Sequence, residues 1–313
     1  MKTGRGSVTA QGIAFIRAYE TSKPPGERIC NDPLARQLIH PVYYWMGRLF
    51  APPAEKREPG VMGFIATRCR YMDEYLLDGL ARGIQQVVIL GAGLDSRAYR
   101  LVQMRSVRVF EVDQAATQEG KKRKLQGILG TLPAHVTFVS IDFDVESLDK
   151  LLTSGYDPQL KTLFIWEGVV HYLTAAAVDQ TLAWVPKNSG TGSSIIFDYL
   201  YTEALTGEHQ RAEIRRTRRS GRWSGEVVTF GIPEGQAVEF MQARGYADVV
   251  SVTADDLKRL YCTGANAGRA VAPVYALVHG WVGGQLAEVR GKEHSIEDDG
   301  RVYAGPGGPI PTC

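Results

Sequence analysis

The chain has 313 residues, of which 44% are hydrophobic and 22% charged, and its formal net charge at pH 7 is +2. These fractions are those of an ordinary globular protein and exclude a chain that is disordered throughout. So small a net charge argues against a nucleic-acid or membrane partner, no signal peptide is visible, and no run approaches the ~18 apolar residues that cross a bilayer. The four cysteines include no C-x-x-C pair, so we expect a reduced, cytoplasmic protein without a metal site.

The first part of the chain, residues 1–84, is predicted to be a helical cap. Its apolar periodicity is helical, with breaks expected at 22–33 and 49–60, where prolines and glycines cluster. We expect this cap to contribute to a cofactor and substrate site.

The central part, residues 85–285, alternates short β-branched or aromatic runs with helical segments, a pattern typical of a parallel sheet with helices on both faces. A helix is expected from Pro233 to Gly245. Seven strands are predicted, at 85–90, 107–112, 136–140, 162–166, 193–199, 247–252 and 274–281.

A helical lid insertion is expected near 202–245, and it contains an arginine cluster from Arg211 to Arg222. This cluster can be a solvated helix face, part of a lid that attracts an acidic substrate, or, least in keeping with the small net charge, a nucleic-acid contact. The Gly- and Pro-rich residues 286–313 are expected to form a loose tail.

The sequence "VVILGAGLDSRAYR" at 87–100 carries a glycine turn, Gly91-Ala92-Gly93, after the first strand. Such a turn can hold a dinucleotide or S-adenosylmethionine, or it can simply reverse the chain. A dinucleotide fingerprint has a third glycine where this chain has Ser96, and the Asp95 carboxylate would repel a pyrophosphate.

Acidic residues follow several of the predicted strands. Glu111 and Asp113 lie 20 and 22 residues beyond Gly91, and the alternation of a strand favours Asp113 as the ligand of ribose hydroxyls. Asp142 and Glu167 follow the third and fourth strands. Several acids at one sheet edge suit the ammonium, sulfonium and hydroxyl groups of S-adenosylmethionine better than a pyrophosphate.

Taken in order, several segments resemble the leucine carboxyl methyltransferase family, and in particular its bacterial S-adenosylmethionine-dependent O-methyltransferases. They span roughly residues 10–200: "RAYETSKPPGERICNDPLARQLI", "ATRCRYMDEYL", "VVILGAGLDSRAYRL", "FEVDQAATQEGKKRKL", "VSIDFD", "IWEGVVHYLT" and "FDYLY". The resemblance implies a Rossmann-like, class I methyltransferase fold, with a seven-stranded, mostly parallel sheet and an N-terminal helical cap. It also implies S-adenosyl-L-methionine as the cofactor and S-adenosyl-L-homocysteine as the product.

The resemblance further implies roles for individual residues. Arg68 would bind the carboxylate of the methionine moiety, with Arg70 as a second candidate unless it pairs with Asp73 or Glu74 on the surface. The remaining cofactor-binding roles would belong to Gly91 and Gly93 at the methionine and ribose, Asp113 at the ribose hydroxyls, Asp142 and Phe143 at the adenine, and Glu167 at the ammonium.

His171 departs from the family pattern, which usually has an apolar residue at this point of "EGVVHYL". It is a candidate general base or substrate-positioning group, unless it is a histidine satisfied at the rim of the pocket. The sequence therefore predicts O-methylation of a small-molecule carboxylate or hydroxyl. Transfer to carbon or nitrogen, a nicotinamide-dependent oxidoreductase, and a ligand-binding subunit without turnover remain alternatives.

Overall fold

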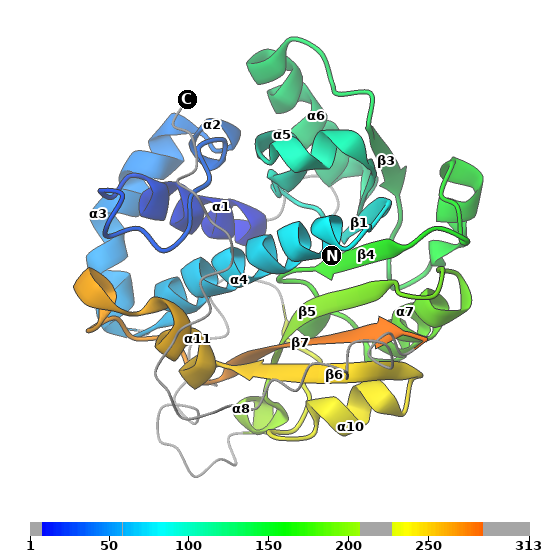
Figure 1. Cartoon of the computed structure of the whole chain (residues 1–313). Coiled ribbons are helices and arrows are strands. Elements are labelled where there is room, and N and C mark those ends of the chain that lie inside the picture. Colours follow the sequence, from blue (N-terminus) through cyan, green and yellow to red (C-terminus); the bar gives the residue numbers. More distant parts are fainter. Residues whose placement is uncertain (1–7, 58, 207–226, 284–313) are drawn as a thin grey trace.

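A seven-stranded sheet forms the centre of the structure, a computed structural model that describes residues 8–57, 59–206 and 227–283 (Figure 1). The strands are β1 (Gln86–Leu90), β2 (Arg108–Asp113), β3 (Val136–Ser140), β4 (Thr162–Trp166), β5 (Ser194–Leu200), β6 (Tyr246–Thr253) and β7 (Tyr275–Val282). They lie in the order β3-β2-β1-β4-β5-β7-β6, and β7 runs antiparallel to both of its neighbours. The seven predicted strands and the predicted α/β class are confirmed.

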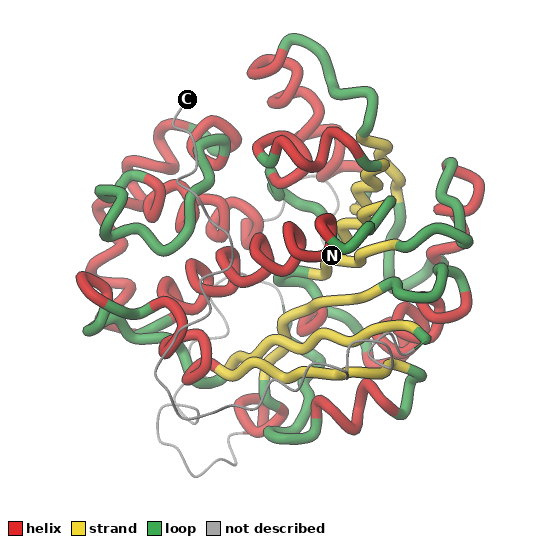
Figure 2. The backbone as a smooth tube through the Cα atoms, viewed as in Figure 1, coloured by secondary structure: helices red, strands yellow, loops and turns green. Residues whose placement is uncertain are grey.

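Helices flank the sheet on both sides (Figure 2). They are α1 (Val8–Thr21), α2 (Ala35–Leu38), α3 (Pro41–Arg57), α4 (Val61–Ala81), α5 (Arg97–Arg100), α6 (Ala115–Leu129), α7 (Ala175–Lys187), α8 (Thr202–Thr206), α10 (Ala237–Gln242) and α11 (Ala254–Tyr261). None of these described helices is long and apolar enough to cross a membrane.

The strand order reverses at β1, which pairs with β2 on one side and with β4 on the other. Because parallel crossovers are right-handed, the connection through α5 and the connection through α7 lie on opposite faces of the sheet. The loops that leave the carboxyl ends of β1 and β4 therefore diverge and leave a crevice between them, the place where open α/β sheets bind ligands.

Both central strands, β1 and β4, are buried along their whole length, which explains why they are unbroken apolar runs in the sequence. The N-terminal helices pack beside the crevice. The Arg17 side chain of α1 donates to Asp32 at 2.9 Å and to the carbonyl of Leu94 at 2.6 Å, and all three residues are buried. The N-terminal helices are thus tied directly to the loop that follows β1.

Two predicted elements are shorter than expected. The break expected at 49–60 is present, but α3 continues through Pro52 and Pro53 as far as Arg57, and α4 begins at Val61. Tyr44 and Ala51, seven residues apart on one face of α3, are both buried in the core. The helix expected from Pro233 to Gly245 shortens to α10, since the chain first makes a turn in which Gly235 has a φ of 81°.

Several predictions lie outside the described residues. These are the arginine cluster from Arg211 to Arg222, most of the lid insertion, and the tail at 286–313. The division of the chain into cap, core and tail stays a prediction. Cys30, Cys69 and Cys262 are buried free thiols.

Candidate functional site

The glycine turn after β1 is bound directly to the end of β2. Gly91 and Gly93 have positive φ angles of 65° and 41°, and a Cβ atom on Gly91 would lie 2.4 Å from Cγ2 of Val169. The amide of Gly93 donates to Oδ2 of Asp113 at 2.5 Å. Glycine is therefore required at position 91 by both conformation and space, and the turn and the predicted ribose ligand form one unit.

Asp113 is in turn linked to Asp142 through the residue between β2 and α6. The amide of Gln114 donates to Oδ1 of Asp113 at 2.7 Å, and its side-chain amide donates to Oδ2 of Asp142 at 3.2 Å. Burial raises the pKa of Asp113, and the amides of Gly93 and Gln114 partly offset that rise. The structure thus brings together two predicted cofactor ligands from adjacent strand ends.

The other candidate on β2, Glu111, takes no part in this arrangement. It is fully buried and forms an ion pair with Lys121 of α6 at 2.7 Å. The alternation argument that favoured Asp113 over Glu111 is therefore consistent with their placement. Phe143, beside Asp142, is half-buried, and its ring centroid lies 6.0 Å from that of Trp166 at the end of β4.

Arg68 of α4 is held between the carboxylates of Glu167, directly after β4, and of Asp198, within β5. Its Nε donates to Oε1 of Glu167 at 3.0 Å and its Nη1 to Oδ2 of Asp198 at 2.6 Å. Asp198 also accepts from the amide of Gly168 at 2.6 Å. Burial opposes the charge on Arg68, but the attraction of Asp198 and Glu167 outweighs it and raises the arginine pKa.

A second buried arginine, Arg97 of α5, reaches the same carboxylate. Its Nη1 donates to Oε2 of Glu167 at 2.6 Å and also to Asp95, while its Nε donates to Asp73 at 2.7 Å. Burial alone would raise the pKa of Glu167, but the charges of Arg97 and Arg68 outweigh it and lower that pKa. Glu167 is therefore ionised and shared by two guanidinium groups.

Sequence reasoning identified Arg68 and Glu167 but missed Arg97 and Asp198. Within the described part of the chain, the Nη2 atoms of both Arg68 and Arg97 are buried without a hydrogen-bond partner. Two unpaired donors beside one ionised carboxylate can bind a group that carries both a carboxylate and an ammonium. This donor set therefore fits the methionine end of S-adenosylmethionine.

Arg70 lies away from this cluster. Its side chain is half-exposed, pairs with Glu74 and donates to the carbonyl of Ile29 at 3.3 Å. The structure therefore has the surface-pair alternative for Arg70, with Glu74, one of the two predicted partners. Asp73 pairs instead with Arg97 and with Arg100, the latter at 2.6 Å.

His171 lies in a short 3₁₀ helix, Val170–Tyr172, that follows β4. Its ring is buried, and its Nδ1 has no hydrogen-bond partner among the described residues. Burial lowers the pKa of His171 to about 4, with the charge of Arg68 adding to that effect and the charge of Asp198 opposing it. His171 is therefore a neutral group near Arg68 and Asp198 at physiological pH.

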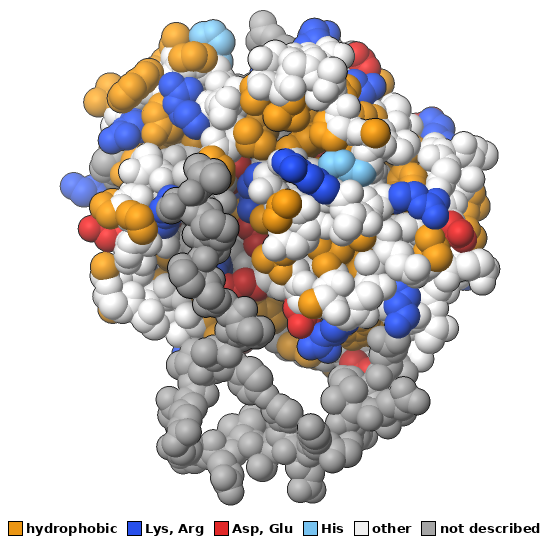
Figure 3. Space-filling model, turned by 45° about the horizontal axis from the view of Figure 1, so that its top comes forward, with side chains coloured by type: hydrophobic (Ala, Val, Ile, Leu, Met, Phe, Trp, Pro, Cys, Tyr) orange, Lys and Arg blue, Asp and Glu red, His pale blue; other side chains and the backbone are white. Residues whose placement is uncertain are grey.

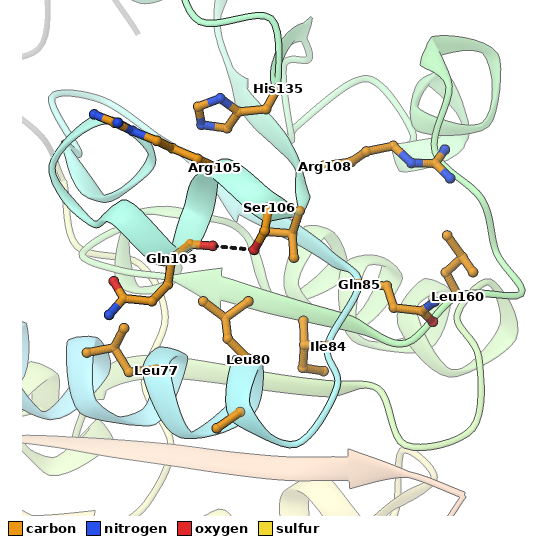
Figure 4. A pocket seen from close by; sticks show the side chains of 12 residues that line it. Leu77, Leu80, Ile84, Gln85, Gln103, Arg105, Ser106, Arg108, His135 and Leu160 are labelled. Carbon is orange, nitrogen blue, oxygen red and sulfur yellow. Dashed lines mark hydrogen bonds between the residues drawn. The ribbon is translucent and has the colours of Figure 1, made fainter. Parts of the chain in front are cut away.

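A large cavity of about 1020 Å³ lies elsewhere (Figure 4). Four of the residues that line it stand at or before the amino ends of strands: Gln85 at β1, Arg108 at β2, His135 at β3 and Leu160 at β4. In a parallel sheet this is the edge opposite to Asp113, Asp142 and Glu167, so the cavity is separate from the predicted cofactor site.

Comparisons with known proteins identify the family to which this chain is similar. The family model "Leucine carboxyl methyltransferase" matches residues 10–186. A Mycolicibacterium gilvum protein named "Putative S-adenosyl-L-methionine-dependent methyltransferase" is 30% identical over 272 residues, 80% of this chain and 87% of that protein. A Bacillus subtilis protein of the same name, with the suffix YktD, is 30% identical over 288 residues, 83% of this chain and 93% of its own.

Two solved structures share the fold. A "putative methyltransferase" of Thermobifida fusca has a TM-score of 0.55 at 14% identity and covers 88% of this chain and 95% of its own. A "duf574 family protein" of Streptomyces avermitilis has a TM-score of 0.56 at 14% identity, with coverages of 86% and 96%. At such identities the structural likeness establishes the fold alone.

Proposed function

The chain belongs to the leucine carboxyl methyltransferase family, and from this membership we propose that it methylates an oxygen atom of a small-molecule acceptor. It is an S-adenosyl-L-methionine-dependent methyltransferase, the activity that the names of these relatives give. The acceptor and the atom methylated are the new part of the proposal.

One observation carries the assignment of the cofactor site: the guanidinium groups of Arg68 and Arg97, from two different helices, meet at the single carboxylate of Glu167. Their unpaired Nη2 atoms would hold the cofactor's carboxylate, and Glu167 retains lone pairs for its ammonium. When bound, the cofactor supplies a methyl group activated by a sulfonium. Because that leaving group is good, the protein needs chiefly to align the acceptor and exclude water.

The acids at the ends of β2 and β3 would hold the nucleoside. Each oxygen of Asp113 already accepts one backbone N–H, from Gly93 or Gln114, which fixes the carboxylate in one orientation. A carboxylate oxygen can accept two hydrogen bonds, so each still has capacity for one ribose hydroxyl. Asp142 would accept from the adenine amino group, and Phe143 would pack beside the base.

His171 favours a carboxylate among the possible oxygen acceptors. A general base works best when its pKa lies near the working pH, whereas the pKa of His171 is lowered to about 4. A substrate carboxylate is already a nucleophile and needs no base. We therefore propose that His171 positions the acceptor and does not act chiefly as a general base that removes the proton of an alcohol.

A nicotinamide-dependent oxidoreductase is less well supported than a methyltransferase, although the argument that Asp95 would repel a pyrophosphate no longer holds. Asp95 is buried and paired with Arg97, so its charge is compensated and would not by itself repel a pyrophosphate. Asp113 would suit the ribose of either cofactor, so it does not discriminate between them. Asp142 remains as a further acid at the ligand edge without an arginine partner among the residues described.

Titration calorimetry tests the cofactor. The protein should bind S-adenosylmethionine and S-adenosylhomocysteine but not NAD. Asp142→Asn should weaken binding of the first two by about tenfold, the effect of roughly one hydrogen bond to a charged group. Asp144→Asn, an exposed carboxylate two residues away, is the matched control and should bind as the wild type does. Binding of NAD alone would overturn the assignment.

A methyl-acceptor screen tests the rest of the proposal. Carboxylic acids, phenols and alcohols are incubated with the protein and with cofactor that carries a deuterated methyl group, and the products are identified by mass spectrometry. Methyl esters should appear before ethers. Label found on carbon or nitrogen would refute oxygen as the acceptor.

A further inference from the structure

An exposed apolar stripe runs along α3. It consists of Val42, Trp45, Met46, Leu49 and Phe50, whose exposed fractions are 58%, 62%, 53%, 72% and 56%. Their spacing of three, one, three and one residues places them on one face of the helix. The other exposed large hydrophobic residues of the described chain are scattered over different elements. A contiguous exposed apolar patch of this kind often marks a binding surface.

The opposite face of α3 fixes the direction of this stripe. Tyr44 and Ala51 are each only 5% exposed and belong to the core formed with α1. Gly47 fits tightly against Phe15 of α1, since a Cβ at position 47 would lie 2.5 Å from the ring. The stripe is therefore a ridge held outwards by packing from behind. It is not a face that could turn inwards by rotation of the helix.

Basic residues outnumber acids beside the stripe. The sequence of α3 has three Lys or Arg and one acid, Glu55, and a second acid, Glu58, follows it. Glu55 is only partly exposed and accepts from the amide of Gly60 at 2.8 Å, whereas Arg48 and Lys56 are exposed. The guanidinium of Arg48 lies 5.7 Å from the ring of Trp45. Figure 3 shows hydrophobic side chains beside Lys and Arg on the upper left of the molecule.

We propose that α3 is an interfacial helix that docks the protein on an anionic membrane surface. A helix whose apolar face carries Trp, Phe and Leu beside Lys and Arg inserts that face among lipid headgroups, while the positive charges contact anionic lipids. The small net charge of the whole chain argued against a membrane partner. That argument does not apply to α3, because a net charge does not report how the charges are distributed.

A second copy of the chain fits this surface less well. The five side chains together expose on the order of 500 Å², and a stable dimer interface buries about 800 Å² on each partner.

Only α1 separates the stripe from the glycine turn of the proposed active site. The stripe sits on α3, α3 packs on α1, and Ala10 of α1 approaches Gly93, where a Cβ would lie 3.4 Å from that of Ala10. The docking itself does not depend on the proposed acceptor, because it is measured by binding to lipid and not by turnover.

Vesicle co-sedimentation tests the proposal, with vesicles of phosphatidylcholine alone or mixed with phosphatidylglycerol. The wild type should bind the mixed vesicles and lose affinity in high salt. Leu49→Glu should lower the apparent partition coefficient by about tenfold or more, since it places a charge on the apolar ridge. Leu129→Glu alters a lone exposed leucine at the end of α6 and should bind as the wild type does.

Lys56→Glu keeps the apolar stripe intact and should fold normally, because Lys56 is exposed. It should reduce binding to the mixed vesicles several-fold while leaving S-adenosylmethionine binding unchanged. The proposal is overturned if the wild type ignores both vesicles, or if the Leu49 and Leu129 variants bind equally well. It is also overturned if sedimentation velocity finds a dimer that Leu49→Glu converts to a monomer, because α3 would then be a subunit interface.

Discussion

Replacing Asp198 by asparagine should destabilise the fold and the proposed cofactor site together. The side chain is fully buried, with Oδ2 2.6 Å from Nη1 of Arg68 and Oδ1 accepting from the amide of Gly168. Asparagine can keep the bond to Gly168 but removes the charge. Breaking one partner out of a buried pair costs about 3–5 kcal/mol, and since Glu167 still faces Arg68, we expect the lower end, about 3 kcal/mol.

Urea unfolding followed by circular dichroism at pH 7 measures this loss. Asp179→Asn is the matched control, because Asp179 also pairs with an arginine, Arg244 at 2.5 Å, but 53% of its side chain is exposed. An exposed pair is worth about 0–1 kcal/mol. Asp198→Asn should also weaken S-adenosylmethionine binding at least tenfold, because Arg68 loses one of its two fixed partners. Equal stability of the two variants would refute the reasoning.

Three further results are expected. Gly91→Ala should lose about 2 kcal/mol or more of stability from its positive φ and its contact with Val169, and adding Val169→Ala should recover the part due to the contact, as urea unfolding can show. Burial lowers the pKa of His171 and of His279 to about 4, so unfolding takes up protons and the free energy of unfolding falls as the pH drops from about 6.5 towards 4. Replacing either histidine by glutamine should reduce that slope by up to ~1.4 kcal/mol per pH unit, and an unchanged slope would contradict its burial. Arg97→Lys should lower the free energy of unfolding by about 2–4 kcal/mol, because a lysine ammonium cannot reproduce the planar guanidinium that pairs with three carboxylates. A loss below about 1 kcal/mol would contradict a role for the guanidinium geometry.

The fold was predictable because its signals are local. Each strand of the sheet is a short apolar run, and the acids that follow β2, β3 and β4 must share one edge once the strands are parallel. The proline pair in α3 misled the prediction for the opposite reason. Pro52 and Pro53 disfavour a helix locally, whereas the burial of Tyr44 and Ala51 depends on contacts with α1 that lie far away in the sequence.

The buried ion pairs around Glu167 could be predicted only in part. Arg68 was found through a family resemblance, whereas Arg97 sits in "DSRAYR" beside Arg100, and nothing local distinguishes a buried arginine from a solvated one. Asp198 was hidden in the same way within "FDYLY". Both become recognisable only when α4, α5 and β5 meet, because burial of a charge is a property of the assembled fold.

The charge balance of this cluster gives a physical reason for the choice of cofactor. Its members are the four arginines Arg17, Arg68, Arg97 and Arg100 and the five acids Asp32, Asp73, Asp95, Glu167 and Asp198. With every member ionised the cluster carries a net charge of −1, and burying an uncompensated charge is costly. Asp113 and Asp142 add two further carboxylates at the same edge of the sheet. S-adenosylmethionine carries one carboxylate, one ammonium and one sulfonium, a net charge of +1, and would therefore reduce the negative charge of the site. A dinucleotide would add negative charge to it, so the arginines favour S-adenosylmethionine although each of them, taken alone, would attract a phosphate.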